Sequence, residues 1–314
     1  MVVAPSIFEA LRAVISENFG GEAHMNRIGG YLDRSLVFSI PEFHTVIKLF
    51  LHAADKKYGN ETSAYDQLRG TQFPSPQLLD SGRLNTGQPW IMISEINGTN
   101  AEECVREQSI DTIELFGALG GLLADLHHLP LKGTPNDKAA VFETQMDHQF
   151  EYCERAARTV NDAQPLLARA LELMKTIRGD LDIYADELVF VHGDFKPRNV
   201  IAAGCNERPR ILGIIDFEKA HIGHKAEDLC ALFSMERTAA ELHAFLQAYD
   251  DVDEQTWRFV TYFFCGYAAE IATWAPQADP GYYRSVMNVL RRVLAHAPRG
   301  DYDLYANWPK TGSL

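Results

Sequence analysis

Polar side chains that can bind a cation and handle a proton gather in two short segments in the second half of the chain. The first reads Val-His-Gly-Asp-Phe-Lys-Pro-Arg-Asn-Val over residues 191–200, and the second reads Ile-Ile-Asp-Phe-Glu over residues 214–218. Each segment follows an apolar run that predicts a buried strand. Asp194 and Asn199 share one predicted turn and Asp216 follows the neighbouring strand, so two carboxylates and an amide oxygen are expected to converge.

Such a set of oxygen groups suits one type of chemistry. Carboxylate and amide oxygens are hard ligands of the kind that Mg²⁺ takes together with water and phosphate oxygens. A carboxylate that does not bind the metal is left to orient a hydroxyl nucleophile, and phosphoryl transfer needs this division of tasks. The simpler alternative is that Asp194 and Asp216 are turn and strand-end residues satisfied by backbone amides, which explains one acid but not the whole set.

In this order and at this spacing, the two segments resemble the aminoglycoside phosphotransferase family. Members of this family are relatives of the protein kinases and include choline kinases and other small-molecule kinases. Residues 192–199 are similar to the family's catalytic loop, and residues 214–218 are similar to its metal-binding segment. The resemblance implies that Asp194 accepts or orients the proton of the substrate hydroxyl, that Asn199 and Asp216 bind the metal, and that His192 braces the loop.

One position departs from the pattern of the antibiotic kinases, and another departs from the pattern of the protein kinases. Lys196 stands where antibiotic kinases commonly have His and is similar to the protein-kinase loop, which implies a catalytic role in neutralising the γ-phosphate. A lysine that only faces solvent is the alternative. Glu218 stands where protein kinases have Gly, which favours the small-molecule branch, and we also expect Glu218 to contact the substrate.

A lysine inside an apolar strand is a further feature that requires explanation. Lys48 interrupts Thr-Val-Ile-Lys-Leu-Phe over residues 45–50, and a buried charge requires a partner. Lys48 resembles the family's phosphate-binding lysine, and the resemblance gives it Glu61 as partner, with Asp66 on the same predicted helix as a weaker candidate. An edge-strand lysine that discourages aggregation is the alternative.

The same resemblance implies further nucleotide contacts. Gly29, Gly30 and Ser35 lie in the segment leading into the first predicted strand, where the family has a flexible loop over the phosphates. Ser94 and Ile96 lie in the segment that joins the two lobes, where backbone groups bind the purine. Such contacts do not distinguish ATP from GTP, so both stay open, with Mg²⁺ as the metal. No G-x-x-x-x-G-K-[ST] segment is present, which excludes a P-loop enzyme.

The elements that must position these groups change character along the chain. Helical spacing predicts a helix from Ser6, followed by strands at 35–40, 45–50 and 90–93. One helix at 61–69, capped by Asn60 and ended by Gly70, interrupts them. From about residue 98 the pattern is mostly helical, apart from a short hairpin predicted from runs at 188–191 and 211–215. The later helices are predicted from a cap at Ser109 onward and at 141–160, 164–178, 226–248, 254–274 and 280–296.

This order predicts an α+β fold of two parts. The resemblance implies a protein-kinase-like arrangement with a small β-rich N-terminal lobe at 1–96, which holds the nucleotide. A hinge near 94–98 leads to a larger, mainly helical lobe at 97–314, which carries catalysis and substrate binding.

The acceptor is less well defined by the sequence. Residues 1–96 carry a net charge of −2 and residues 97–314 carry −12, and an acidic lobe attracts a cationic acceptor such as an aminoglycoside. The late helices are rich in aromatic residues, which favours stacking on a flat or sugar-bearing ligand such as a nucleoside antibiotic. Candidate substrate contacts besides Glu218 are His221, Asp228, Glu270 and Trp274.

We therefore expect an enzyme that transfers the γ-phosphate of ATP or GTP to a hydroxyl of a small-molecule antibiotic, aminoglycoside-like or nucleoside or peptide, and so gives resistance. The same motifs serve a metabolic kinase acting on choline, homoserine or a sugar. A nucleotide-binding pseudoenzyme is a further alternative. A protein kinase is disfavoured because no Ala-Pro-Glu segment follows Asp-Phe-Glu.

Composition excludes several other classes. The 43 acidic and 29 basic residues give a net charge of −14, so nucleic acid is not expected as a partner. Five cysteines without a C-x-x-C pair indicate buried thiols in a reducing cytoplasm. No apolar stretch approaches the ~18 residues of a membrane helix, so no membrane partner is expected either. The histidines at 127, 128, 221 and 224 lack the further ligands of a tetrahedral metal site, and the oligomeric state is left open.

Overall fold

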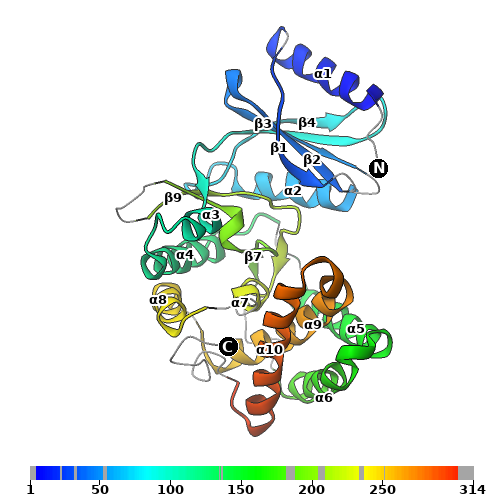
Figure 1. Cartoon of the computed structure of the whole chain (residues 1–314), viewed down its shortest axis with the longest axis vertical. Coiled ribbons are helices and arrows are strands. Elements are labelled where there is room, and N and C mark those ends of the chain that lie inside the picture. Colours follow the sequence, from blue (N-terminus) through cyan, green and yellow to red (C-terminus); the bar gives the residue numbers. More distant parts are fainter. Residues whose placement is uncertain are drawn as a thin grey trace. The chain divides into compact units, whose positions relative to one another are not determined.

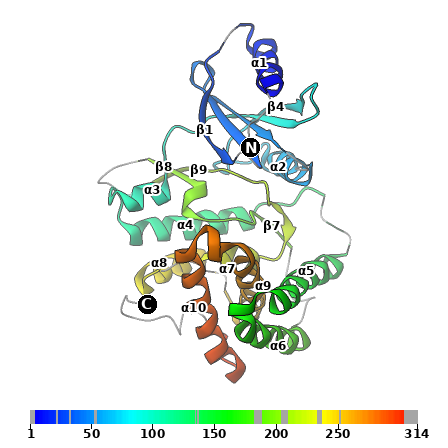
Figure 2. The same ribbon diagram turned by 45° about the vertical axis from the view of Figure 1, so that its right-hand side comes forward.

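The structure, a computed structural model, describes residues 5–21, 23–31, 34–51, 55–133, 135, 137–181, 188–203, 209–232, 237–250 and 252–302. The chain divides into two compact units, each assembled from separate stretches of sequence (Figures 1 and 2). The first contains Met1–Cys104, Arg198–Ala203 and Arg210–Ala220, and the second contains Val105–Pro197, Gly204–Pro209 and His221–Leu314. The predicted division after residue 96 left these two later stretches, Arg198–Ala203 and Arg210–Ala220, out of the first unit.

A five-stranded antiparallel sheet forms the core of the first unit. Its strands are β1 (Asn26–Tyr31), β2 (Ser35–Ile40), β3 (Thr45–Phe50), β4 (Leu78–Arg83) and β5 (Pro89–Ser94), in the order β1-β2-β3-β5-β4. A 3₁₀ turn at Pro41–Phe43 joins β2 to β3. β2 and β3 have the predicted bounds, because their apolar and β-branched side chains give a clear strand signal.

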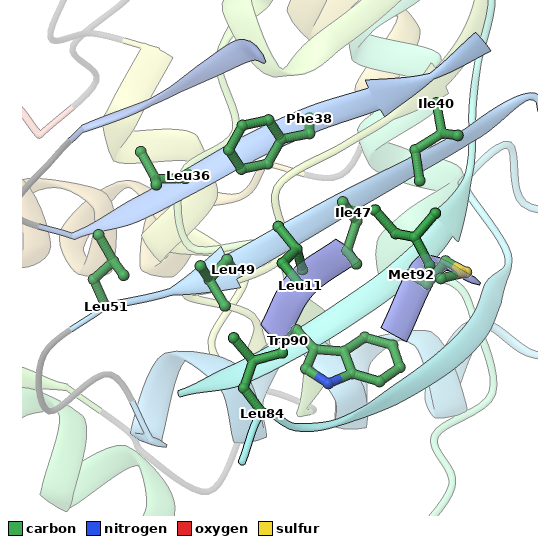
Figure 3. Close-up of a cluster of buried hydrophobic side chains, with 11 residues drawn as sticks. Leu11, Leu36, Phe38, Ile40, Ile47, Leu49, Leu51, Leu84, Trp90 and Met92 are labelled. Carbon is green, nitrogen blue, oxygen red and sulfur yellow. The ribbon is translucent and has the colours of Figure 1, made fainter. Parts of the chain in front are cut away.

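Helix α1 (Pro5–Phe19) covers one face of this sheet. Successive side chains of a strand point to opposite faces, so Phe38 of β2 and Ile47 of β3 lie in the same apolar cluster as Leu11 of α1 (Figure 3). These side chains are almost completely buried. The helix begins one residue earlier than predicted, because proline fits the first turn of a helix well.

Helix α2 (Asp55–Leu68) contacts the central strands of the same sheet. Lys48 lies between two residues of the α1-facing cluster in β3, so the alternation of a strand turns its side chain to the other face. In α2, Glu61 shares its buried side with Ala64 and Leu68, at the three- and seven-residue spacing of a helix face. Local periodicity in both elements therefore brings a buried lysine and a buried glutamate to the same layer.

The helix predicted at 61–69 is wrong at its N-terminal end. The α2 helix begins at Asp55, and Asn60 lies inside it and does not cap it. Its side chain instead donates a hydrogen bond from Nδ2 to the Glu218 carbonyl oxygen at 3.1 Å. Tertiary contacts thus override the low helix propensity of Gly59 and Asn60. Gly70, with φ of +80°, follows the end of the helix as predicted.

The glycine pair lies within the sheet and not in a loop ahead of it. β1 pairs with β2 through Gly29 and Val37 and through Gly30 and Leu36. The expectation that these glycines precede the first strand is therefore wrong, because β1 has too few β-forming side chains to be recognised. Gly30 has φ of +84°, and a Cβ there would lie 2.2 Å from the Ser35 carbonyl oxygen, so this position requires glycine.

Short strands form two smaller sheets whose pairing differs from the predicted hairpin. In the first unit, β8 (Val200–Ala203) pairs with β9 (Arg210–Ile214) and with β6 (Thr99–Asn100). In the second unit, β7 (Val189–Val191) pairs with β10 (His221–Gly223). The hairpin predicted from 188–191 and 211–215 is therefore wrong. The true partners were missed because strands of three or four residues carry too little pattern.

Helices make up most of the second unit. They are α4 (Thr112–His127), α5 (Lys138–Thr159), α6 (Gln164–Asp180), α7 (Ala226–Leu232), α8 (Ala239–Tyr249), α9 (Glu254–Ala278) and α10 (Pro280–His296). Helix α3 (Ala101–Arg106) and a 3₁₀ turn at Pro197–Asn199 both cross the division between the units. Further 3₁₀ turns occupy Asn161–Ala163 and Ala297–Arg299.

Two helix predictions in this unit need correction. Asp111, not Ser109, caps α4, since its side chain accepts a hydrogen bond from the Glu114 amide. The helix predicted at 226–248 is two helices, α7 and α8, and residues 233–236 between them lie outside the described part of the chain. Thr238 begins α8 with a reciprocal hydrogen-bond pair to Glu241.

Helix α9 packs against α5, α6, α7 and α10, and α4 packs against α8. Both groups can be followed in Figure 2. The α4–α8 approach is close, because a Cβ at Gly120 would lie 2.2 Å from the Phe245 carbonyl oxygen. The protein therefore has the predicted α+β fold, with a small antiparallel sheet unit and a larger helical unit. Among the helices in the described ranges, none combines the length and apolar character needed to cross a membrane.

Candidate active site

One lysine holds three carboxylates together in the first unit. Lys48 Nζ lies 2.8 Å from Glu61 Oε2, 2.6 Å from Asp216 Oδ1 and 3.2 Å from Glu218 Oε2. The predicted Lys48–Glu61 pair is present, whereas Asp66 forms an exposed ion pair elsewhere. β3 is flanked by β2 and β5, so the interpretation of Lys48 as an edge-strand lysine is wrong.

The charges of this cluster shift the ionisation of its members. Burial alone lowers the pKa of Lys48, but the carboxylates of Glu61, Asp216 and Glu218 raise it far above its ordinary value. Burial raises the pKa of Glu61 to about 7, against the attraction of the lysine. Carboxylate oxygens of the three acids lie within 4.8 Å of one another. The positive charge of Lys48 is therefore what permits these carboxylates to lie so close together.

Glu218 ties helix α2 to the segment that follows β9. Its Oε1 forms an ion pair with Lys57 Nζ, and its backbone carbonyl accepts the hydrogen bond from Asn60. Both partners were missed, because α2 was predicted to begin only at residue 61; Asp55 in the first turn was the available signal of an earlier start. The Glu218 side chain is 17% exposed and both its oxygens bind lysines. Its contact with the substrate stays a prediction.

The expected metal ligands leave the same end of the β8–β9 pair. Val200 pairs with Ile214, and the Ile215 amide donates to the Asn199 carbonyl oxygen at 2.9 Å, which holds Asn199 close to Asp216. Asp216 has φ of +68°, an uncommon conformation that persists where the surroundings enforce it. One carboxylate and one amide oxygen are donors that fit Mg²⁺. The metal-binding role of both residues stays a prediction.

The other predicted nucleotide contacts lie along the same sheet. Ser35 is the first residue of β2 and is buried. Ser94 ends β5, where its amide donates to the Gln77 carbonyl oxygen at 2.9 Å. That amide is therefore engaged by Gln77, and the purine contacts expected of the Ser94 and Ile96 backbone stay predictions. Ile96 packs closely against Gly213, since a Cβ there would lie 2.5 Å from Ile96 Cδ1.

In the second unit, the loop after β7 carries the predicted catalytic acid. The Asp194 amide donates to Nδ1 of the completely buried His192 at 3.2 Å, so His192 braces the loop as expected. Asp194 Oδ1 lies 2.8 Å from Lys196 Nζ. The Lys196 side chain is only 10% exposed, so the alternative of a solvent-facing lysine is wrong. Phe195 between them is buried and anchors the turn in the apolar interior.

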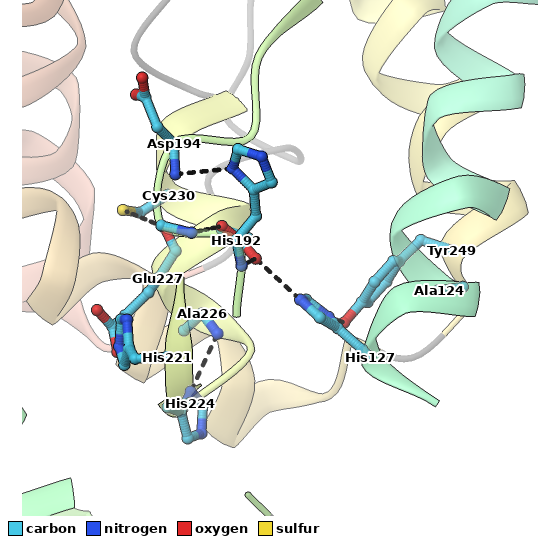
Figure 4. Close-up of polar contacts among 12 residues, drawn as sticks. Ala124, His127, His192, Asp194, His221, His224, Ala226, Glu227, Cys230 and Tyr249 are labelled. Atoms are coloured by element: carbon cyan, nitrogen blue, oxygen red, sulfur yellow. Dashed lines mark hydrogen bonds and ion pairs between the residues drawn. The ribbon is translucent and has the colours of Figure 1, made fainter. Parts of the chain in front are cut away.

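Asp228 of α7 fixes the backbone of this loop. Its carboxylate accepts hydrogen bonds from the amides of His192 and Gly193, both at 2.8 Å. His127 Nε2 lies 3.1 Å from Asp228 Oδ2, and the Tyr249 hydroxyl lies 2.7 Å from His127 Nδ1 (Figure 4). Asp228 is completely buried. The predicted substrate contact at Asp228 is therefore corrected: this carboxylate positions the loop, because its oxygens are engaged by backbone amides and a histidine.

The remaining substrate candidates lie on nearby elements of the second unit. His221 Nε2 is 3.1 Å from Glu227 Oε1. Trp274 of α9 is 46% exposed, and its ring contacts that of Tyr282 with the centroids 6.3 Å apart. Glu270 is half-buried one helical turn before Trp274. Their contacts with a substrate stay predictions.

The Asp228 network leads to a prediction on stability. Burial raises the pKa of Asp228, but the hydrogen bonds from His127 and the His192 amide outweigh it and hold the pKa below its ordinary value of 3.8. The stabilisation is therefore present above pH 3.8 and is lost as the pH falls through the depressed value. We expect Asp228→Asn to lose about 2–4 kcal/mol of unfolding free energy at pH 7.

Urea unfolding at pH 7 and at pH 3 measures this difference. The difference in unfolding free energy between Asp228→Asn and the wild type should be smaller at the lower pH, because the wild-type carboxylate becomes protonated there and no longer stabilises the fold. Asp147→Asn is the matched control, since its exposed pair with Arg178 contributes only about 0–1 kcal/mol. A variant as stable as the wild type at pH 7 would contradict the role given to Asp228.

Comparisons with known proteins agree with this architecture. A family model described as the phosphotransferase enzyme family (APH) matches residues 28–263. No curated protein sequence matches the chain. A thermostable mutant of aminoglycoside phosphotransferase APH(4)-Ia, in ternary complex with AMP-PNP and hygromycin B, is 13% identical, with 93% of this chain and 98% of that chain covered and a TM-score of 0.67.

Two further solved structures are similar over most of their length. The GDP and kanamycin complex of APH(2")-IIia is 17% identical, with 90% of this chain and 97% of that chain covered and a TM-score of 0.65. APH(3'')-Id from Streptomyces rimosus is 18% identical, with 85% and 99% covered and a TM-score of 0.61. These likenesses show the protein-kinase-like fold that the sequence motifs implied. Because the family model spans most of the sequence, the chain belongs to the phosphotransferase enzyme family and is a kinase-like transferase that acts on a hydroxyl group.

Proposed function

We propose that this phosphotransferase uses ATP or GTP to phosphorylate a hydroxyl group of a small-molecule antibiotic, and so gives resistance to it. The acceptor is an aminoglycoside-like compound or a nucleoside or peptide antibiotic. The observation that carries the proposal is that each unit contains one structured site, and that the residues of both sites occur along the chain in the order of the family's motifs. These sites are the Lys48 cluster in the first unit and the Asp194 loop, braced by His192, in the second.

Each group has a task in the proposed reaction. Lys48, held by Glu61, binds the phosphates of the nucleotide. Asp194 orients the acceptor hydroxyl and takes its proton, while the hydroxyl oxygen bonds to the γ-phosphorus and the nucleoside diphosphate leaves. Lys196 stabilises the negative charge of the transferred group. Asn199 and Asp216 would hold Mg²⁺, which when bound neutralises charge on the nucleotide phosphates.

The acceptor class rests on different support. The similar structures include complexes of other enzymes with hygromycin B and with kanamycin, and those enzymes are aminoglycoside phosphotransferases. The net charge of −12 over residues 97–314 favours a cationic acceptor. Trp274 offers an exposed ring for stacking on a flat or sugar-bearing molecule.

We also propose that the enzyme works in a reducing cytoplasm. Cys104, Cys153, Cys230 and Cys265 are free and buried. Burial raises the pKa of Cys153 to about 12 and raises those of Cys230 and Cys265 well above the ordinary value. Such thiols are structural and unreactive. Cys205 lies outside the described residues.

A nucleotide-consumption assay over a panel of acceptors tests the proposal. The full chain is supplied with Mg²⁺ and either ATP or GTP, and release of nucleoside diphosphate is measured with hygromycin B, kanamycin, a nucleoside antibiotic, a peptide antibiotic, choline, homoserine and a hexose. We expect acceptor-dependent release with an antibiotic. Release only with choline, homoserine or the hexose would identify a metabolic kinase instead. Tight nucleotide binding without release for any acceptor would identify a pseudoenzyme.

A further inference from the structure

The ammonium group of Lys196 lies between a carboxylate and two aromatic rings. Its Nζ is 5.5 Å from the ring centroid of Tyr267 in α9 and 5.7 Å from that of Tyr282 in α10. The two tyrosine hydroxyls are hydrogen-bonded to each other. Asp194 contacts the same ammonium at 2.8 Å. Residues that are distant in sequence therefore surround one buried cation.

Aromatic rings hold a cation in a way that carboxylates do not. The face of a tyrosine ring attracts an ammonium through its quadrupole, and the attraction grows when the site is shielded from water. The ring carries no net charge, so it fixes the lysine without neutralising it. A lysine held by a second carboxylate would have its field cancelled. Here the positive charge of Lys196 is offset by Asp194 alone among the groups that contact it in the described part of the chain.

We propose that Tyr267 and Tyr282 are positioning residues, which hold the ammonium of Lys196 beside Asp194 so that its charge acts on the phosphoryl group being transferred. This inference rests on the proposed function, because it takes Lys196 and Asp194 as the reacting pair. The tyrosines act through the lysine and need not touch the substrate. The hydroxyl bond between them links α9 to α10 and sets the separation of the two rings.

No sequence pattern indicates this arrangement. Tyr267 and Tyr282 stand at helical spacing among many aromatic residues of the late helices, where most rings belong to the core. Both are only half-buried in the structure, and each lies over the same lysine. Tyr283 follows Tyr282 in the same helix with a similar half-buried position. Tyr283→Leu is therefore the matched control, because it makes the same substitution in the same helix.

The first experiment measures how firmly the two tyrosines keep the Lys196 amine in place, and it does not require the protein to be active. The full chain is labelled with an amine-reactive reagent, and the rate at Lys196 is followed by peptide mass spectrometry. We expect Tyr267→Leu and Tyr282→Leu to speed labelling by about 5- to 30-fold, because a shielded cation–π contact of ~1–2 kcal/mol is lost. Tyr283→Leu should leave the rate at the wild-type value. Equal rates in all four proteins would overturn the inference.

The second experiment measures the effect on the reaction. Tyr282→Leu should lower kcat by about 5- to 30-fold with little change in the KM for nucleotide, and the same change in a Lys196→Met background should have no further effect. Tyr282→Phe keeps the ring and loses only the hydroxyl bond to Tyr267, so its kcat should lie between those of the wild type and Tyr282→Leu, which separates loss of the cation contact from misfolding. Equal losses in both backgrounds, or an unchanged kcat, would overturn the positioning role.

The two experiments separate the inference from the function on which it rests. If the wild type transfers no phosphate to any acceptor, the proposed function fails, and faster labelling in Tyr267→Leu and Tyr282→Leu would still support the hold on Lys196. If transfer occurs but labelling is unchanged, the function stands and the inference fails.

Discussion

Replacing Asp194 by asparagine is expected to lower turnover by about 10²- to 10⁴-fold, the range that a positioned proton acceptor contributes. The amide has nearly the shape of the carboxylate but cannot take the proton of the acceptor hydroxyl. It also breaks the ion pair with Lys196. Nucleotide binding should survive, because Lys48 and its partners lie in the other unit. Steady-state kinetics with a fluorescent-nucleotide titration measures both quantities.

Asp253→Asn is the matched control for this change. Asp253 caps α9 by accepting a hydrogen bond from the Thr256 amide, and asparagine caps a helix about as well as aspartate. We therefore expect near wild-type turnover and stability in that variant. Turnover in Asp194→Asn within about threefold of the wild type would remove Asp194 from the reaction, because loss of an essential base costs far more.

The second large effect is expected at Lys48. Lys48→Met leaves the carboxylate of Glu61, whose side chain is 1% exposed, without its counter-charge. Removal of one partner of a buried ion pair costs about 3–5 kcal/mol of unfolding free energy. We also expect the KM for nucleotide to rise steeply, since Lys48 is the proposed phosphate ligand. Chemical unfolding and initial-rate kinetics measure the two effects separately.

A second change should restore one of these losses and not the other. In Lys48→Met combined with Glu61→Gln, no buried carboxylate remains at residue 61, so much of the stability should return while nucleotide affinity stays low. Lys57→Met, which breaks the more exposed contact with Glu218, is the control and should cost about 0–1 kcal/mol. If Lys48→Met and Lys57→Met were equally stable, the Lys48 cluster would not have the energetic role described.

Some elements of the fold could be predicted from sequence because their signals are local. In β2 and β3, apolar side chains that face α1 alternate with side chains on the opposite face of the sheet, and the bounds of both strands follow from that pattern. Strand β1, with its glycine pair, and strands β8 and β10, with three or four residues each, have no comparable signal. Their existence depends on partners that are distant in the sequence.

The candidate site divides in the same way. A charge in an apolar strand requires a counter-charge, which predicted a partner for Lys48, and the family resemblance identified that partner as Glu61. Lys57 was not predicted, because tertiary contacts extend α2 past residues with low helix propensity. Asp228 was misjudged as a substrate contact, since no sequence pattern shows that an acid 35 residues beyond Gly193 accepts its amide hydrogen bond.

The most direct test of phosphoryl transfer to a hydroxyl follows the γ-phosphoryl group itself. Nucleotide labelled with heavy oxygen in that group is incubated with the full chain, Mg²⁺ and the acceptors of the panel, and the products are identified by mass spectrometry. We predict that the label appears as a phosphate ester of one acceptor, in equal amount to the nucleoside diphosphate, and that Asp194→Asn abolishes it. Label found only in inorganic phosphate, or ester formed equally well by Asp194→Asn, would contradict this account.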